Sequence, residues 1–155
     1  MQDRALRKQL VTLLQGGEAH APVEETVRSF NAAHAGSRIE PIRNTPWRLI
    51  EHLRIAQWDI LEFSRNPQHV SPKFPSGYWP QSDAPANGAS WQTAVESFCA
   101  DLRAMQALVA NQNTDLFAPI PHGEGQTILR QALLVVDHNA YHMGQLVALQ
   151  RALES

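Results

Sequence analysis

The sequence predicts an all-α fold, with one domain over residues 1–155 arranged as a four-helix bundle with a long crossover connection. Apolar residues recur at steps of three and four in four separate segments, which is the spacing of helices that bury one face. Two long stretches rich in proline and glycine join these segments, and no stretch shows the alternation of a half-buried strand. A chain of 155 residues fits one domain and can bury its own core.

The two N-terminal helices are expected at residues 4–14 and 23–33. Gly16 and Gly17 follow the first of them and favour its end, because glycine readily adopts the left-handed conformation found at helix C-termini. The second is shorter and carries apolar residues at helical spacing. Four leucines are expected to share the buried face of the first helix: Leu6, Leu10, Leu13 and Leu14.

A longer helix is expected over residues 46–65. Thr45 can accept a hydrogen bond from a free backbone N–H, and Pro46 suits the first helical position because it has no N–H to leave unpaired. Asn66 precedes Pro67, and a residue before proline is disfavoured in helical conformation, so the helix should end there.

The crossover is expected at residues 66–88, because proline interrupts helices and this stretch is longer than most connections. Tyr78 and Trp79 within it predict that it packs against the helices, either as a lid over a substrate pocket or only as an anchor. A second irregular stretch is expected at residues 113–125. The prolines of the crossover are Pro67, Pro72, Pro75, Pro80 and Pro85.

The last two helices are expected at residues 90–111, capped by Ser90, and at residues 126–153. Both have a buried face with apolar residues at steps of four and three. In the helix at residues 90–111 these residues are Trp91, Val95, Phe98, Leu102, Met105 and Val109. In the helix at residues 126–153 the buried face consists of Ile128, Ala132, Val135, Asn139, His142, Leu146, Leu149 and Leu153.

Charge and composition argue against several classes of protein. The formal net charge is -2, from 13 Lys and Arg against 15 Asp and Glu, and no basic cluster is present, so no nucleic-acid partner is expected. The single Cys99 cannot form an internal disulfide. The first ten residues lack the apolar core of a signal peptide, and the densest apolar run, residues 132–136, is too short to span a bilayer. A cytoplasmic protein without a membrane partner is therefore expected.

Histidines interrupt the apolar faces of two helices. His138 and His142 are four residues apart, so both project from one side of the last helix and can reach one ion. His52 lies within an apolar stripe of the second long helix and should also point inward. Three neutral imidazoles would make a three-ligand metal site with open positions, and Asp59, two turns after His52, could orient a ligand or take part in chemistry.

Structural alternatives remain open at this point. Asn139 and His142 would then be a hydrogen-bonded pair in the core, and His52 a histidine satisfied by its neighbours. A di-iron carboxylate site is not expected, because the chain has no Glu-x-x-His motif. A bis-histidine haem is disfavoured, because His138 and His142 share one helix face.

Two segments resemble the motifs of a known family. Residues 47–59, WRLIEHLRIAQWD, are similar to the second-helix motif of DinB-like proteins, and residues 137–146, DHNAYHMGQL, to their last-helix motif. A softer resemblance covers most of the chain. It implies a four-helix bundle with a long crossover and one divalent metal ion (zinc, nickel, iron or manganese) on three histidines, which correspond to His52, His138 and His142. It also implies a homodimer.

The resemblance implies a divalent-metal-dependent enzyme in which the metal acts as a Lewis acid on water or a small thiol, giving a hydrolase or a thiol-dependent transferase. The expected partners are a small-molecule substrate and a low-molecular-weight thiol. Asp59 and Tyr141 are the candidate catalytic residues, with Gln145 as a further neighbour of the metal ligands. The alternatives are a non-catalytic bundle that binds a metal or small ligand, and a structural bundle without a metal. The histidines outside the motifs, such as His69 and His122, are expected to be structural or solvated.

Overall fold

The computed structural model of the protein describes residues 2–155, and this part of the chain is all-α, with five helices and no strand. Met1, which belongs to the expected domain, lies outside the described residues. Short 3-10 turns occur at η1 (Ala32–His34) and η2 (Ser76–Tyr78). The helices are α1 (Gln2–Gln15), α2 (Val23–Ser29), α3 (Pro46–Arg65), α4 (Gly88–Ala110) and α5 (Ile128–Leu153).

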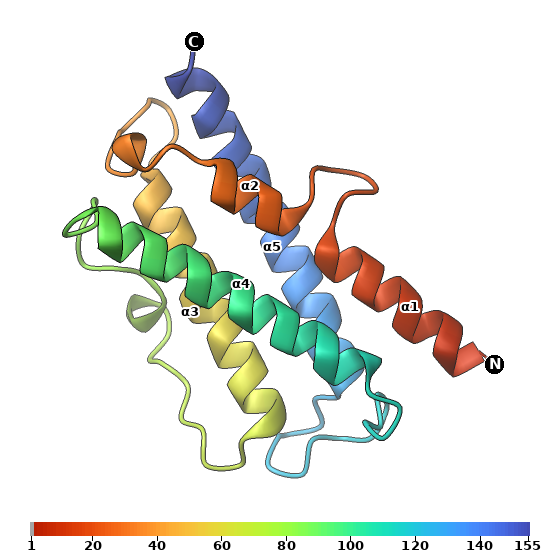
Figure 1. The fold of residues 1–155 in the computed structure, drawn as a ribbon. Helices are drawn as coiled ribbons and strands as arrows, with labels where there is room; N and C mark the ends of the chain where they lie inside the picture. The colour runs from red at the N-terminus through yellow and green to blue at the C-terminus, as the bar shows by residue number, and fades with distance from the viewer. Residues whose placement is uncertain (1) are drawn as a thin grey trace.

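The four long helices pack in pairs around one core. α3 packs against α4 and α5, and α1 packs against the same two helices. Figure 1 shows α4 crossing in front of α3 and α5, with α1 extending to one side and the short α2 lying above α4. The expected apolar face of α4 is buried along its whole length, as is that of α5 from Ile128 to Leu149. The periodicity therefore identified these two buried faces correctly.

Helix boundaries follow local capping. Thr45 accepts a hydrogen bond from the backbone N–H of Arg48, which confirms the predicted start of α3. The predicted cap of α4 is wrong: Asn87, in extended conformation, accepts from the N–H of Ser90, so the helix already begins at Gly88.

Two predictions at the N-terminal end are also wrong. The second helix ends at Ser29 rather than at residue 33, because Phe30 turns to extended backbone and buries its ring in the core. Leu13 does not share the buried face of α1 and is 46% exposed, because only a narrow face of α1 meets α4 and α5.

The connection between α3 and α4, residues 66–87, runs back along α3 to the end where α3 begins (Figure 1). Its return is fixed by hydrogen bonds from the N-terminal end of α3: the hydroxyl of the capping residue Thr45 donates to the Asp83 carbonyl, and the Trp47 indole N–H donates to the Ser82 hydroxyl. Because it lies along α3 for this whole length, the connection can contribute residues to a site on that helix.

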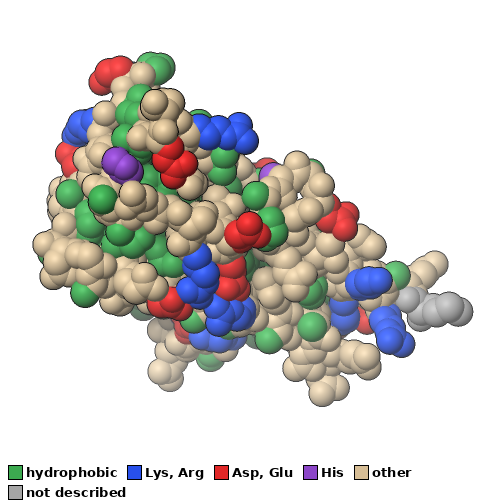
Figure 2. All heavy atoms as spheres, turned by 45° about the horizontal axis from the view of Figure 1, so that its top comes forward, with side chains coloured by type: hydrophobic (Ala, Val, Ile, Leu, Met, Phe, Trp, Pro, Cys, Tyr) green, Lys and Arg blue, Asp and Glu red, His purple; other side chains and the backbone are tan. Residues whose placement is uncertain are grey.

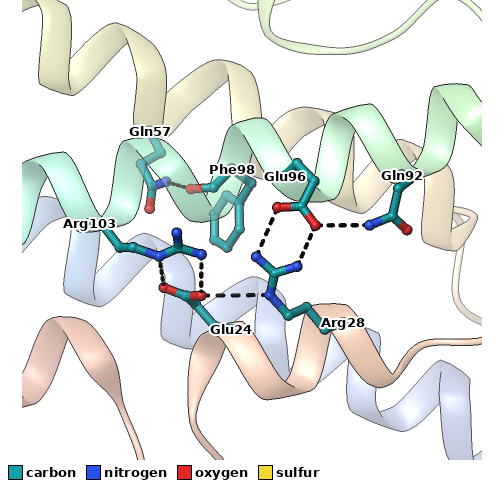
Figure 3. A network of polar contacts seen from close by, with 7 residues as sticks. All are labelled: Glu24, Arg28, Gln57, Gln92, Glu96, Phe98 and Arg103. Atoms are coloured by element: carbon teal, nitrogen blue, oxygen red, sulfur yellow. Dashed lines mark hydrogen bonds and ion pairs between the residues drawn. The ribbon is translucent and has the colours of Figure 1, made fainter.

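The short helix α2 is fixed against α4 by apolar burial and by surface ion pairs. Val27 of α2 is fully buried. Glu24 pairs with Arg103, and Arg28 pairs with Glu96, as Figure 3 shows. Exposed pairs of this kind contribute about 0–1 kcal/mol each, so the buried apolar residues do more to hold α2 in place.

The surface carries no strong field of one sign on the face drawn in Figure 2, where basic and acidic side chains lie interleaved. This distribution agrees with the small net charge and offers no basic stripe for a phosphate backbone. None of the helices in residues 2–155 combines the length and the apolar character that crossing a membrane requires.

Candidate metal centre

Three histidines that are far apart in the sequence meet between α3 and α5. His52 comes from α3, and His138 and His142 come from successive turns of α5. One ring nitrogen from each lies within 4.8 Å of the other two. The closest pair, the Nε2 atoms of His52 and His138, is 3.0 Å apart. The packing of α3 against α5 therefore brings the three imidazoles, which the sequence predicted to point inward, around one point.

In His52 and His142, a hydrogen-bond acceptor outside the cluster determines which ring nitrogen carries the hydrogen and which keeps a free lone pair. His52 Nδ1 lies 2.8 Å from the backbone carbonyl oxygen of Tyr78. A carbonyl can only accept, so Nδ1 carries the hydrogen and Nε2 keeps its lone pair. His142 Nδ1 donates in the same way to Gln145 Oε1, at 3.1 Å. Two of the three imidazoles therefore present an unprotonated Nε2.

The electrostatic environment keeps the imidazoles neutral. Burial, together with the electrostatic effect of its two histidine neighbours, lowers the pKa of His138 to about 4. Burial also lowers the pKa of His52, opposed by its bond to the carbonyl of Tyr78, and lowers the pKa of His142. Neutral imidazole is the form that binds a metal ion, so the cluster is prepared for a cation near pH 7.

Aromatic side chains cover two of the rings. Trp79, from the connection between α3 and α4, stacks on His52 with ring centroids 3.9 Å apart and planes 2° from parallel. Tyr141 places its ring edge to face against His142 at 4.9 Å and is itself 67% exposed. The predicted packing of Trp79 against the helices is confirmed. The ring of Tyr141 lies against the outer side of the cluster and does not enter the space between the three histidines.

Asp59 lies close to the cluster but is bound elsewhere. One of its oxygens accepts from His69 Nε2 at 2.7 Å, and the other accepts from the Tyr78 hydroxyl at 2.7 Å. Burial and the bond to Asp59 raise the pKa of Tyr78 to about 12. Asp59 thus holds the side chain of Tyr78, and the backbone carbonyl of Tyr78 accepts the hydrogen bond that orients His52.

His69 is the residue of this region that sequence reasoning missed. Its side chain is only 6% exposed and packs edge to face against Trp58, although its neighbours in the sequence suggested a solvated loop. The signal available was weak: His69 is ten residues after Asp59, and a contact across the turn at Asn66 and Pro67 follows no helical period.

The alternative interpretation of the core polar residues is wrong in one respect. Asn139 does not pair with His142; its Nδ2 donates to Gln57 Oε1 at 2.9 Å. Gln57 in turn donates to the backbone carbonyl of Phe98 (Figure 3), which ties α3, α4 and α5 together. Gln57 is 1% exposed and lies on the buried face of α3, where its amide can meet that of Asn139.

Other candidate groups lie outside the cluster. His122 Nε2 donates to the backbone carbonyl of Phe63 at 2.7 Å, and its ring packs edge to face against the ring of that residue. Cys99 is fully buried, and burial raises the pKa of its thiol to about 11, in agreement with its expected role as a small core residue.

The donor set fits a divalent cation. Zinc–nitrogen distances are about 2.0–2.1 Å, so two nitrogens on one ion lie at most about 4.2 Å apart. The 3.0 Å pair satisfies this limit, and the widest pair, within 4.8 Å, needs only a small movement of one ring. Three neutral imidazoles, two of them oriented by hydrogen bonds to groups outside the cluster, form a common metal-binding set.

A profile of the DinB superfamily matches residues 6–146. The chain belongs to the DinB superfamily. Members of this superfamily bind metals, and all three histidines of the cluster lie within the matched residues. No curated protein and no solved structure gives a match.

Proposed function

We propose that this DinB superfamily protein is a single four-helix-bundle domain that holds one divalent metal ion on His52, His138 and His142. The bundle would consist of α1, α3, α4 and α5, with residues 66–87 as its crossover. The observation that supports the metal site is the convergence of three neutral imidazoles from two helices, with their ligand nitrogens within 4.8 Å of one another.

Zinc, nickel, iron and manganese are all candidates, because imidazole nitrogen suits each of these ions. When bound, the ion would supply Lewis-acid activation of water or of a small thiol. The protein contributes the ligand orientation: the Tyr78 carbonyl holds His52, Gln145 holds His142, and Trp79 excludes water from one face of His52.

We further propose a metal-dependent enzyme, either a hydrolase or a thiol-dependent transferase, that acts on a small molecule. Asp59 and Tyr141 are the proposed supporting residues. Both oxygens of Asp59 are engaged by His69 and Tyr78, which favours a positioning role that keeps Tyr78 against His52. Tyr141 stands at the exposed side of His142, where it can contact a bound substrate.

The second candidate is a protein that binds a metal or a small ligand without turnover. The engagement of Asp59 favours it, because this carboxylate lines the cavity beside the cluster with no free oxygen to accept a proton. A cytoplasmic location and a homodimer remain predictions. Light scattering of the purified protein would test the dimer.

Metal content and turnover test these proposals together. The purified, untagged protein should contain about one divalent ion per chain, and a His138→Ala/His142→Ala variant should contain none while keeping its helical circular dichroism. His20→Ala/His122→Ala removes two exposed histidines as a matched control and should retain the metal. Metal-dependent turnover in a screen of esters and thiols would support the enzyme, and binding without turnover would support the second candidate.

A further inference from the structure

A cavity of about 270 Å³ opens beside the histidine cluster. His52 and His138 lie at its wall, and α3 contributes Ala56 and Ile60 to it. Larger cavities occur elsewhere on the molecule, such as one of about 510 Å³ near Glu51, but the residues that line them include none of the three histidines. Among these cavities, this one alone has histidines of the cluster in its wall.

The wall of this cavity is apolar. Aromatic rings of Phe74, Tyr78 and Trp79 enter from the crossover, and Leu134 enters from α5. No lysine or arginine is among the lining residues. A ligand group placed here would leave water for a mainly hydrocarbon surface, which favours apolar groups and penalises charged ones.

The one carboxylate in the cavity offers little to a cationic group. Asp59 is 8% exposed, and its two oxygens already accept from His69 and Tyr78. A cation would have to compete with these two donors, and an anion would be repelled. An apolar lining whose one carboxylate is already hydrogen-bonded therefore favours an uncharged ligand group in the part of the cavity away from the metal ion.

The size of the cavity sets an upper limit on that ligand. An apolar cavity of about 150 Å³ is enough to hold benzene, so 270 Å³ accommodates one aromatic ring with a short substituent. Two of the lining residues are exposed, Phe74 at 83% and Leu134 at 37%, so the cavity opens to solvent at an apolar rim.

We propose that this cavity is the specificity pocket of the site, and that it binds a small uncharged apolar group of the substrate, a single aromatic ring or a short branched alkyl group. This inference rests on the proposed metal function, because the pocket would place the reacting part of the substrate at the histidine cluster. It assigns the substrate class by size and charge.

Three probes of one shape and different charge test the pocket: benzyl alcohol, benzoate and benzylamine. Their binding would be followed by NMR titration of the metal-free protein, using the indole signal of Trp79, so that no charged probe can gain a metal contact. Benzyl alcohol should bind at least about tenfold more tightly than either ion, because an unpaired charge is costly to bury. Equal binding of the three, or preference for an ion, would overturn the proposal.

Two variants localise the binding. Ala56→Leu fills the cavity and should abolish the titration of benzyl alcohol. Leu134→Arg places a cation at the exposed rim and should reverse the preference in favour of benzoate. Leu133→Arg makes the same change at a neighbouring residue that is 46% exposed and outside the cavity, and should leave the preference unchanged. Wild-type behaviour of Leu134→Arg would overturn the proposal even if Ala56→Leu failed to fold.

Metal content separates this inference from the function on which it rests. A protein that binds metal but shows no selectivity among the probes keeps the proposed function and loses the pocket. A protein that binds benzyl alcohol selectively but takes up no metal loses the proposed function and keeps the pocket as a binding site.

Discussion

The two irregular connections of this protein look alike in sequence and differ in what they do. Residues 66–87 contain five prolines and one glycine, residues 111–127 contain two of each, and both connections contact α3. The second connection buries Leu116 and Ile120 in the core and forms a short bridge between Pro119 and Thr127. This connection therefore adds to the hydrophobic core and contributes no residue to the histidine cluster or to the cavity beside it.

The first connection contributes polar and aromatic groups to the histidine cluster. The carbonyl of Tyr78 bonds to His52, its hydroxyl bonds to Asp59, and Trp79 stacks on His52. The difference arises from position: this connection runs back along α3 past the polar interruption in its apolar face, whereas the other stays near the end of that helix. Function and stability should therefore be separable by mutation in the two connections.

The largest effect is expected on stability, in the second connection. Leu116→Ala removes a fully buried side chain and should lower the free energy of unfolding by about 2–5 kcal/mol. Urea denaturation of the metal-free protein measures this change. Zinc affinity of the folded variant, measured by calorimetry, should stay unchanged, and a parallel loss of affinity would break the separation between the connections.

A pH dependence of similar size is expected at the cluster. The pKa of His138 is lowered to about 4 in the folded state, against about 6.5 for an ordinary imidazole, so the unfolded chain binds the extra proton between these values. The metal-free protein should therefore be fully stabilised above pH 6.5 and lose roughly 2–3 kcal/mol as the pH falls to 4.

Denaturation curves at pH 7 and pH 4.5 check this expectation. His138→Gln keeps a polar side chain without the titration, so it should show a smaller loss of stability over the same range. An unchanged loss in this variant would assign the pH dependence to other groups.

The aromatic cover of the cluster should matter next. Trp79→Ala removes the ring stacked on His52 and should weaken zinc binding by about 10–100-fold, the range observed for groups that orient metal ligands. Trp79→Phe retains a stacking ring and should recover most of the affinity. Calorimetric titration of both variants gives the comparison, and equal affinities for alanine and phenylalanine would show that stacking has no part in binding.

The smallest effect is expected at Asp59, which acts one step further away, through Tyr78. Asp59→Asn keeps an oxygen for one of its two donors and should weaken zinc binding by less than about tenfold. His122→Ala, in the second connection, is the matched control and should have no effect. A larger loss for His122→Ala than for Asp59→Asn would reverse the roles assigned to the two connections.

The contrast between the connections also shows how far the sequence predicts this protein. Periodicity identified the buried faces of α4 and α5 and put His52, His138 and His142 on the inward faces of their helices, because helical spacing fixes which side chains share a face. Thr45 and Pro46 predicted the start of α3 for a local reason, the free N–H groups of a first turn.

What the sequence did not predict depends on contacts between irregular backbone and distant helices. The bond from His69 to Asp59 and that from His52 to the carbonyl of Tyr78 follow no period. The pairing of Asn139 with Gln57 needs the relative height of α3 and α5, which neither helix specifies alone. These contacts follow from tertiary packing, and they define much of the environment of the site.

X-ray absorption spectroscopy at the zinc edge of the zinc-loaded protein would identify the metal ligands directly. Three imidazole nitrogens are expected in the first coordination shell at about 2.0–2.1 Å, and imidazole scattering should be lost in the His138→Ala/His142→Ala variant. A first shell without imidazole, or one that is the same in the double variant, would contradict a metal site on His52, His138 and His142.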